Sequence, residues 1–227
     1  MNNALILFTR VPIPGMTKTR LMPFLTGEEC AKVHTCFVKD IYAKAKEVNA
    51  DVFVFYTPRD KKEILKKELD DEAVYLPQYG DDLGERMKNA IGICLRMGYE
   101  KVLLMGTDIP QIHPETLRDA FENLNKKDIV IHPTFDGGYY LIGMKKEYDS
   151  IWQVERYGTN TVIYDTLQHM KRERLLTSVG QMYYDVDDKE DLRHLYDDIK
   201  KGAVCNCPVT MTYLESYLKD RLENEYE

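Results

Sequence analysis

The chain has little that would suit a membrane or a nucleic acid. Its apolar stretches are strand-sized, and its first residues, MNNALILFTR, have no basic lead followed by a full hydrophobic signal segment. These absences predict a cytoplasmic protein with no membrane partner. The 31 Lys and Arg residues face 38 Asp and Glu, and the formal net charge of −7 argues against general affinity for nucleic acid. An anionic ligand would therefore need a local basic cluster.

Common zinc, redox and hydrolase signatures are also missing. The five cysteines are an odd number without paired metal-ligand spacing, and we interpret them as reduced and mostly structural. Cys205 and Cys207 have no second cysteine or histidine pair beside them, so a metal or redox role for this pair stays open but unsupported. No H-E-x-x-H spacing, no hydrolase triad pattern and no G-x-x-x-x-G-K phosphate loop is present.

What the sequence does contain is a regular alternation of short apolar runs and helical patterns. With 227 residues and 44% hydrophobic content, it predicts a single domain over 1–227 with a mostly parallel α/β sheet. The expected strands are 4–8, 51–57, 73–77, 101–108 and 128–133, with a hairpin-like segment at 136–143. The expected helices follow Thr26, span 60–69, follow Asp82, start at Pro114, and span 159–171, 188–200 and about 205–227. The last one packs on its own chain or supports a homodimer.

The loop after the first strand carries a basic cluster. Arg10, Lys18 and Arg20 surround the turn VPIPG, where Gly15 permits close backbone approach. Such a loop can hold a polyphosphate, although a surface loop with incidental charges has the same composition. The phosphate interpretation makes this loop, with Thr9, Arg10, Gly15, Lys18 and Arg20, one side of a nucleotide site.

Two carboxylates follow strand-like segments and are candidate metal ligands. Asp108 stands just past an apolar strand in MGTDIP, where Pro110 ends the strand. Asp187 lies with Asp185 on one side of the extended segment DVDDKEDL. Carboxylates suit Mg²⁺ or Mn²⁺, which prefer oxygen ligands. The alternative is that Asp108 satisfies turn amides and that the second cluster caps the next helix.

Two further motifs complete the predicted site. In GDDLGERM, Asp82 is a plausible helix cap, while Gly84 and Arg86 could face the nucleotide. In DGGYYLIG, the Asp-Gly pair predicts a tight hairpin turn, and successive glycines let a ligand lie against the backbone. The candidate acceptor-binding residues there are Asp136, Gly137, Gly138 and Tyr139. Tyr139 and Tyr140 should point to opposite faces of a strand, so only one of them should meet the acceptor.

In their joint order, the segments 8–21, 80–87, 106–110, 136–143 and 185–192 resemble a bacterial family with the nucleotide-diphospho-sugar transferase fold. That family is similar in pattern to the 2-phospho-lactate guanylyltransferases. The resemblance implies a GT-A-type, Rossmann-like α/β/α sandwich, a nucleotide donor and a divalent metal, Mg²⁺ or Mn²⁺. By position it assigns Arg10, Lys18 and Arg20 to the donor phosphates, Asp108 and Asp187 to the metal, and Gly137 and Gly138 to the acceptor.

The resemblance leaves the reaction divided between nucleotidyl and glycosyl transfer. Many glycosyltransferases of this fold carry Asp-x-Asp at the metal strand, whereas this chain has the single Asp108. Together with the basic first loop, this favours metal-dependent nucleotidyl transfer from an NTP to a small phosphorylated acceptor, with Lys18, Arg20 and Asp108 as catalytic residues. Glycosyl transfer from an NDP-sugar is the alternative. A nucleotide-binding regulator without turnover is the third hypothesis.

Overall fold

The protein is built on one twisted sheet of seven strands. The structure is a computed structural model that describes residues 2–154, 156–204 and 206–223. The strand order is β3-β2-β1-β4-β6-β5-β7, and only β6 runs antiparallel to its neighbours. The strands are β1 (Asn3–Arg10), β2 (Asp51–Thr57), β3 (Val74–Pro77), β4 (Lys101–Gly106), β5 (Ile129–Pro133), β6 (Tyr139–Met144) and β7 (Thr177–Val179). The predicted mostly parallel sheet is therefore confirmed.

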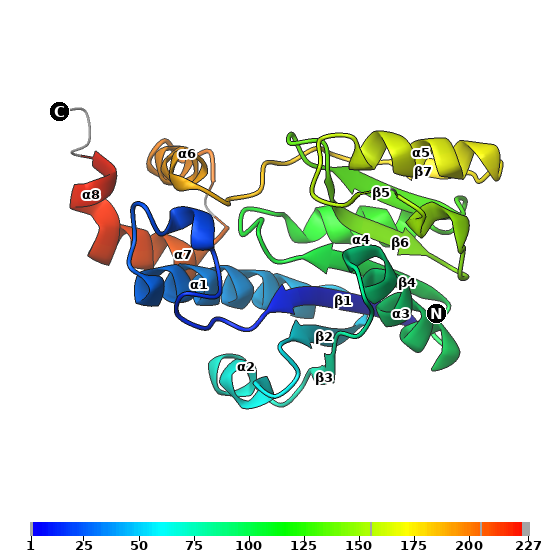
Figure 1. The fold of residues 1–227 in the computed structure, drawn as a ribbon, viewed down its shortest axis with the longest axis horizontal. Coiled ribbons are helices and arrows are strands. Elements are labelled where there is room, and N and C mark those ends of the chain that lie inside the picture. Colours follow the sequence, from blue (N-terminus) through cyan, green and yellow to red (C-terminus); the bar gives the residue numbers. More distant parts are fainter. Residues whose placement is uncertain (1, 155, 205, 224–227) are drawn as a thin grey trace.

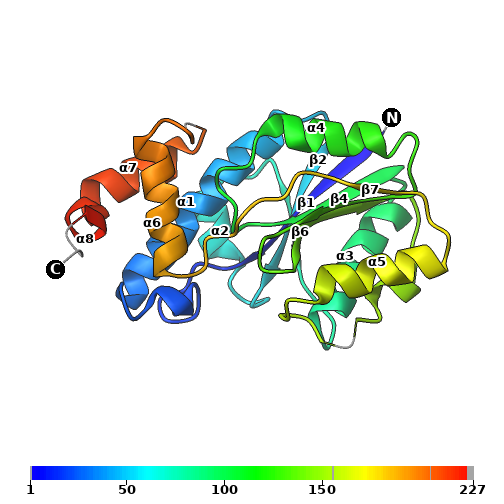
Figure 2. The ribbon, with the colours of Figure 1, turned by 90° about the horizontal axis from the view of Figure 1, so that it is seen from above.

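Helices cover both faces of this sheet, as Figures 1 and 2 show. The main helices are α1 (Gly27–Lys46), α2 (Lys62–Glu68), α3 (Leu83–Arg96), α4 (Pro114–Asn123), α5 (Val162–Arg172), α6 (Lys189–Lys200), α7 (Pro208–Tyr213) and α8 (Lys219–Glu223). Short turns of helix are η1 (Thr19–Leu21), η2 (Ser150–Trp152) and the π-helical η3 (Leu214–Leu218). One face of the sheet packs against α1 and α4, and the other against α3 and α5. Burial of both faces explains why the central strands are apolar throughout.

Helix α1 extends beyond the sheet and joins it to a group of C-terminal helices, α6, α7 and α8. Its start is fixed by the predicted capping box, in which the backbone N–H of Glu29 donates to Thr26 Oγ1 and that of Thr26 donates to the Glu29 carboxylate. Buried residues of α1, namely Cys30, Val33 and Phe37, pack against α6 and the C-terminal helices. Figure 2 shows these helices beside α1, away from the sheet.

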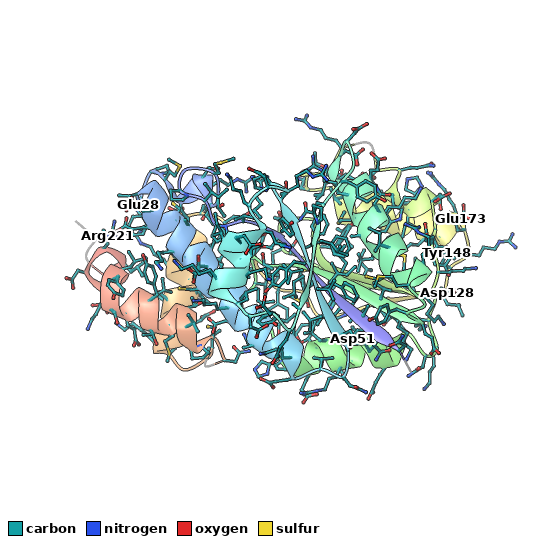
Figure 3. All side chains as sticks on the ribbon, turned by 90° about the horizontal axis from the view of Figure 1, so that it is seen from below. Glu28, Asp51, Asp128, Tyr148, Glu173 and Arg221 are labelled. Atoms are coloured by element: carbon teal, nitrogen blue, oxygen red, sulfur yellow. The ribbon has the colours of Figure 1, made fainter. Side chains whose placement is uncertain are left out.

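The C-terminal helices pack within the chain, which confirms one of the two predicted roles. The Asp40 carboxylate accepts hydrogen bonds from the backbone N–H groups of Val209 and Thr210 at the start of α7. Arg221 pairs with Glu29 of α1. Figure 3 places Arg221 and Glu28 at this helical end of the molecule, with Asp128 and Glu173 at the opposite end. A homodimer stays a prediction.

Two features of the fold differ from the expectation or extend it. The sequence analysis missed β7, because three partly exposed residues show no alternation that could mark a strand. Cys205 lies outside the described residues, so the question of a metal or redox role for Cys205 and the buried Cys207 stays open. Among the described residues we find no helix with the length and apolar character that a membrane crossing requires.

Candidate functional site

The predicted segments meet at the carboxyl ends of β1 and β4. These strands are parallel neighbours, with Phe8 opposite Gly106, so the loops that leave them run side by side. The hydroxyl groups of Thr9 and Thr107 are 2.8 Å apart and join the two strand ends. A cavity of about 650 Å³ opens here. Open α/β sheets bind ligands at this edge.

Lys18 lies at the base of this cavity and contacts both candidate metal ligands. Its ammonium nitrogen is 2.5 Å from Asp108 Oδ1 and 2.9 Å from Asp187 Oδ1, and it donates to the carbonyl oxygen of Val186 at 2.6 Å. Burial opposes the charged form, but the attraction of the two carboxylates outweighs it and raises the pKa of Lys18. Lys18 is therefore a buried cation that joins the first loop to two distant segments.

The backbone at Lys18 is held in an uncommon conformation. Its φ of 52° lies in the left-handed region, where non-glycine residues cost roughly 1 kcal/mol or more. The residue precedes η1, whose Leu21 is fully buried against α1 and α6. This packing fixes the loop so that the Lys18 side chain turns inward toward the carboxylates.

Asp108 and Asp187 form the acidic part of the site. The backbone N–H of Val186 donates to the carbonyl oxygen of Asp108 at 2.9 Å, which fixes the segment 185–187 beside the end of β4. Their side chains are 43% and 34% exposed, so both can reach a ligand. Burial raises the pKa of Asp108, but Lys18 and then His34 outweigh it, so the net direction is downward. The carboxylate is therefore ionised at neutral pH.

The two carboxylates fit a divalent cation. Both have an oxygen within hydrogen-bonding distance of the single Lys18 ammonium group, so one cation can contact the two together. Oxygen atoms are the ligands that Mg²⁺ and Mn²⁺ prefer, and Mg²⁺ usually takes only one or two carboxylates from the protein. The described residues hold no cluster of three or more potential ligands. The remaining positions would belong to phosphates and water.

The basic residues of the predicted nucleotide site lie around the cavity of about 650 Å³. Arg10, Arg20 and Arg86 all line it. Arg20 is exposed and lies 3.4 Å from Asp187, whereas the Arg86 Nε donates to the carbonyl oxygen of Gly80. Four cationic side chains, with Lys18, thus face one space, although the net charge of the chain is negative.

Three predicted nucleotide-binding residues are absent from the described lining of the cavity. Asp82 caps α3 through a hydrogen bond from the backbone N–H of Glu85. Gly84 packs against Tyr157, whose ring a Cβ at Gly84 would approach to 2.5 Å. Gly15 has a φ of 74°, which glycine adopts without strain. Direct contact of these three residues with a nucleotide stays a prediction.

A second cavity, of about 150 Å³, adjoins the first. Its lining includes three of the predicted acceptor residues, Asp136, Gly138 and Tyr139, and it shares Asp108 with the larger cavity. Gly137 has a packing role instead, because a Cβ there would lie 2.1 Å from the carbonyl oxygen of Asn160.

Both tyrosines of the DGGYYLIG motif border the two cavities, and the expectation that only one of them meets the acceptor stays a prediction. Their side chains do point to opposite faces of the sheet, since Tyr140 packs with the α1 side and Tyr139 with the α3 side. The cavities lie at the first residues of β6, and side chains from both faces of the strand border them there.

The sequence analysis missed His34, which lies beneath the site. Its Nε2 is 3.1 Å from Thr9 Oγ1 and 3.1 Å from the carbonyl oxygen of Arg10, and its Nδ1 is 3.9 Å from Asp108. Burial lowers the pKa of His34 to about 4, so the ring is neutral at physiological pH. Its position inside a long amphipathic helix gave no signal of this contact.

Asp185 also lies at the site, although the sequence assigned it no role. It lines the smaller cavity. Burial, followed by the charges of Asp136, Asp187 and Asp108, raises the pKa of Asp185 to about 6. A signal existed, because Asp185 and Asp187 alternate along an extended segment and share one side of it.

The fold and the arrangement of the site define a protein of the nucleotide-diphospho-sugar transferase fold. A crystal structure of a "putative nucleotide-diphospho-sugar transferase" from Desulfovibrio desulfuricans G20 has a TM-score of 0.88, is 32% identical, and matches over 98% of this chain and 97% of that one. The chain belongs to the DUF2064 family, described as "Uncharacterized protein conserved in bacteria", whose model matches residues 41–159. The family resemblance expected from the five motifs is therefore confirmed.

Curated relatives are 2-phospho-L-lactate guanylyltransferases. That of Methanocaldococcus vulcanius is 29% identical over 130 residues, which cover 57% of this chain and 56% of the relative. This chain thus matches about half the length of that relative. The Methanocaldococcus jannaschii protein of the same name is 24% identical over 212 residues, 89% of this chain and 82% of the relative.

Proposed function

We propose that this protein transfers a nucleotidyl group from an NTP to a small phosphorylated acceptor and releases pyrophosphate. The observation that carries the proposal is the position of Lys18 between Asp108 and Asp187 at the base of a large basic cavity. The guanylyltransferase relatives support the same reaction type. Pure binding would not need two carboxylates facing the phosphate-binding cations.

The proposed reaction needs no covalent bond between the protein and the substrate. An oxygen of the acceptor phosphate attacks the α-phosphorus of the NTP, and the bond between this phosphorus and the α,β-bridging oxygen breaks. Pyrophosphate leaves with the electron pair. An ionised phosphate needs no general base, so positioning and charge stabilisation are the main requirements. Lys18 and Arg20 meet them by placing positive charge where negative charge builds up, and Arg10 and Arg86 hold the rest of the polyphosphate.

Asp108 and Asp187 would hold Mg²⁺ or Mn²⁺ in this site. A bound divalent cation neutralises phosphate charge and orients the phosphate groups. In this structure the Lys18 ammonium group pairs with both carboxylates, so the two side chains already lie close to each other. The neutral His34 ring lies beside Asp108, with its Nδ1 3.9 Å from the carboxylate, and makes no hydrogen bond to it.

Glycosyl transfer from an NDP-sugar is the second candidate. It is supported by the Desulfovibrio desulfuricans relative, whose description names a sugar transferase. In that reaction the metal would hold a departing nucleoside diphosphate, and a hydroxyl acceptor would need a carboxylate base. The single Asp108 at the end of β4, in place of Asp-x-Asp, favours nucleotidyl transfer.

A thermal-shift panel tests the proposal. NTPs and NDP-sugars are each added with and without Mg²⁺ or Mn²⁺, and a ligand at 100 times its Kd should add about 2.7 kcal/mol of stability. We expect metal-dependent stabilisation by an NTP. Stabilisation by NDP-sugars alone would overturn the proposal in favour of glycosyl transfer. Metal-dependent NTP binding without pyrophosphate release on any monophosphate would indicate a regulator.

A further inference from the structure

The charged residues in the described lining of the smaller cavity are all acidic. Its carboxylates are Asp108, Asp136 and Asp185, and no Lys, Arg or His belongs to the lining that the structure describes. The cationic residues Arg10, Lys18, Arg20 and Arg86 line the larger cavity instead. At about 150 Å³, the smaller cavity has the volume that roughly five water molecules occupy in the liquid, which suits a small polyol.

The backbone builds this cavity from two segments that are distant in sequence. Thr134 forms a parallel β-bridge with Tyr183, and the backbone N–H of Phe135 donates to the carbonyl oxygen of Tyr183. The bond from Val186 to Asp108 fixes the other side. The cavity walls are therefore held by main-chain contacts.

Asp136 and Asp185, the two carboxylates that line only this cavity, differ in their hydrogen-bond partners. One oxygen of Asp136 accepts from Thr134 Oγ1 at 2.5 Å and from the backbone N–H of Gly138 at 3.0 Å, so its orientation is fixed. Asp185 is only partly buried, and no described side chain forms a hydrogen bond or ion pair with it. Its oxygens are left to accept hydrogen bonds from a ligand or water.

We propose that the smaller cavity binds the uncharged, hydroxylated body of the acceptor, and that Asp136 and Asp185 select against acceptors with a second anionic group. The inference rests on the proposed nucleotidyl transfer. The acceptor phosphate lies at the junction, near Asp108 and the basic loop. Hydroxyl groups donate hydrogen bonds to carboxylates, whereas an acceptor carboxylate in this space would meet the like charges of Asp136 and Asp185. The nearby Lys18 is already paired with Asp108 and Asp187.

This selection separates the chain from the acceptor that its curated relatives are named for. 2-Phospho-L-lactate carries a carboxylate beside its phosphate. We therefore expect it to be a poor acceptor here, while a polyol monophosphate is a good one. Asp185 is the main specificity-determining residue, because it has no structural partner to satisfy.

A matched pair of ligands tests the selection. Glycerol 3-phosphate and 3-phosphoglycerate differ by a hydroxymethyl group in place of a carboxylate. Their dissociation constants are measured by calorimetry on the full chain saturated with Mg²⁺ and a non-hydrolysable NTP analogue. We expect glycerol 3-phosphate to bind at least about tenfold more tightly, since like charges repel strongly in a partly desolvated cavity.

Variants then assign the preference to the cavity. Asp185→Asn should bring the ratio of the two dissociation constants close to one, by weakening glycerol 3-phosphate and strengthening 3-phosphoglycerate. Asp136→Asn should shift the ratio in the same direction, because it removes a negative charge from the cavity. The turn should remain intact, since the Asn Oδ1 can still accept both of its hydrogen bonds. Asp220→Asn, on the exposed surface of α8, should leave it unchanged.

Three results would overturn the inference. These are equal or tighter binding of 3-phosphoglycerate by the wild type, an unchanged ratio in both cavity variants, and no measurable binding of glycerol 3-phosphate. A failure of the proposed function looks different. In that case the NTP analogue would not bind in a metal-dependent manner, whatever the monophosphates do.

Discussion

The two adjoining cavities have opposite charge. The larger one is lined by Arg10, Lys18, Arg20 and Arg86, and the smaller one by carboxylates. They share Gly106, Asp108 and the two tyrosines at the start of β6. Under the proposed function, the basic side would bind the polyphosphate and the acidic side the uncharged body of the acceptor, although the net charge of the chain is −7.

The boundary between the two cavities is where reacting groups would meet. Asp108 belongs to both, and Lys18 contacts it from the basic side. Donor phosphates held by the basic side and an acceptor held by the acidic side would bring their phosphates together at this point. Changes that remove charge from one side only should therefore separate the roles of the two cavities.

The largest effect is expected for Lys18→Met. Loss of the buried cation should lower the turnover number by about 100- to 1000-fold, as for the loss of a group that stabilises transition-state charge. It should also tighten Mg²⁺ binding without nucleotide, because Asp108 and Asp187 lose their internal counter-ion. Calorimetry and steady-state rates check both effects, with exposed Lys126→Met as the control. Unchanged turnover would remove Lys18 from the mechanism.

Asp108→Asn acts at the boundary itself. The change should abolish metal-dependent binding of the nucleotide, with at least about a 100-fold rise in its Kd in the presence of Mn²⁺. The fold should remain, because the side chain is 43% exposed and Asp187 and the Val186 carbonyl oxygen still hold Lys18. Circular dichroism checks the fold. The assignment fails if the Mn²⁺-dependent affinity of the variant equals that of the wild type.

Asp185→Asn changes the acidic side and should stabilise the metal-free protein. The pKa of Asp185 is raised from 3.8 to about 6. The folded state therefore binds this proton more readily than the unfolded state, and stability is lost as pH rises from about 4 to 6. The variant should gain about 1 to 2 kcal/mol at pH 7.5 and nothing at pH 3.5. Denaturant unfolding at both pH values measures this, and a gain of equal size at both would contradict the assignment.

Arg20→Ala should have the smallest effect on the fold. The side chain is 73% exposed and its pair with Asp187 is 3.4 Å long, so the stability change should stay within about 0.5 kcal/mol. Its effect on nucleotide affinity should be several-fold and should shrink as salt rises, because exposed charges are screened. A loss of affinity that does not depend on salt would indicate a buried contact instead.

The sequence predicted the helices and strands that show hydrophobic periodicity, and the loops that are marked by glycine, proline or aspartate. The capping box at Thr26 and Glu29, the strand before Asp108 and the hairpin at Asp136 were all readable, because each depends on residues close together in the chain. These signals also predicted that the basic loop and both carboxylates would share one sheet edge.

The contacts across that edge could not be predicted from the sequence. The position of Lys18 between Asp108 and Asp187 depends on a left-handed backbone turn and on the packing of Leu21, which no local pattern reveals. His34 looked like one more residue of an amphipathic helix. Gly137 proved to be a packing glycine, because its neighbour Asn160 comes from a segment distant in sequence.

The most direct test of the account is pyrophosphate release. The full chain is mixed with Mg²⁺, an NTP and a polyol monophosphate, and ³¹P NMR follows the phosphorus species. The account predicts one pyrophosphate for each acceptor consumed, with a new phosphoanhydride signal in the product. Release of a nucleoside diphosphate from an NDP-sugar, with no pyrophosphate from any NTP, would contradict it.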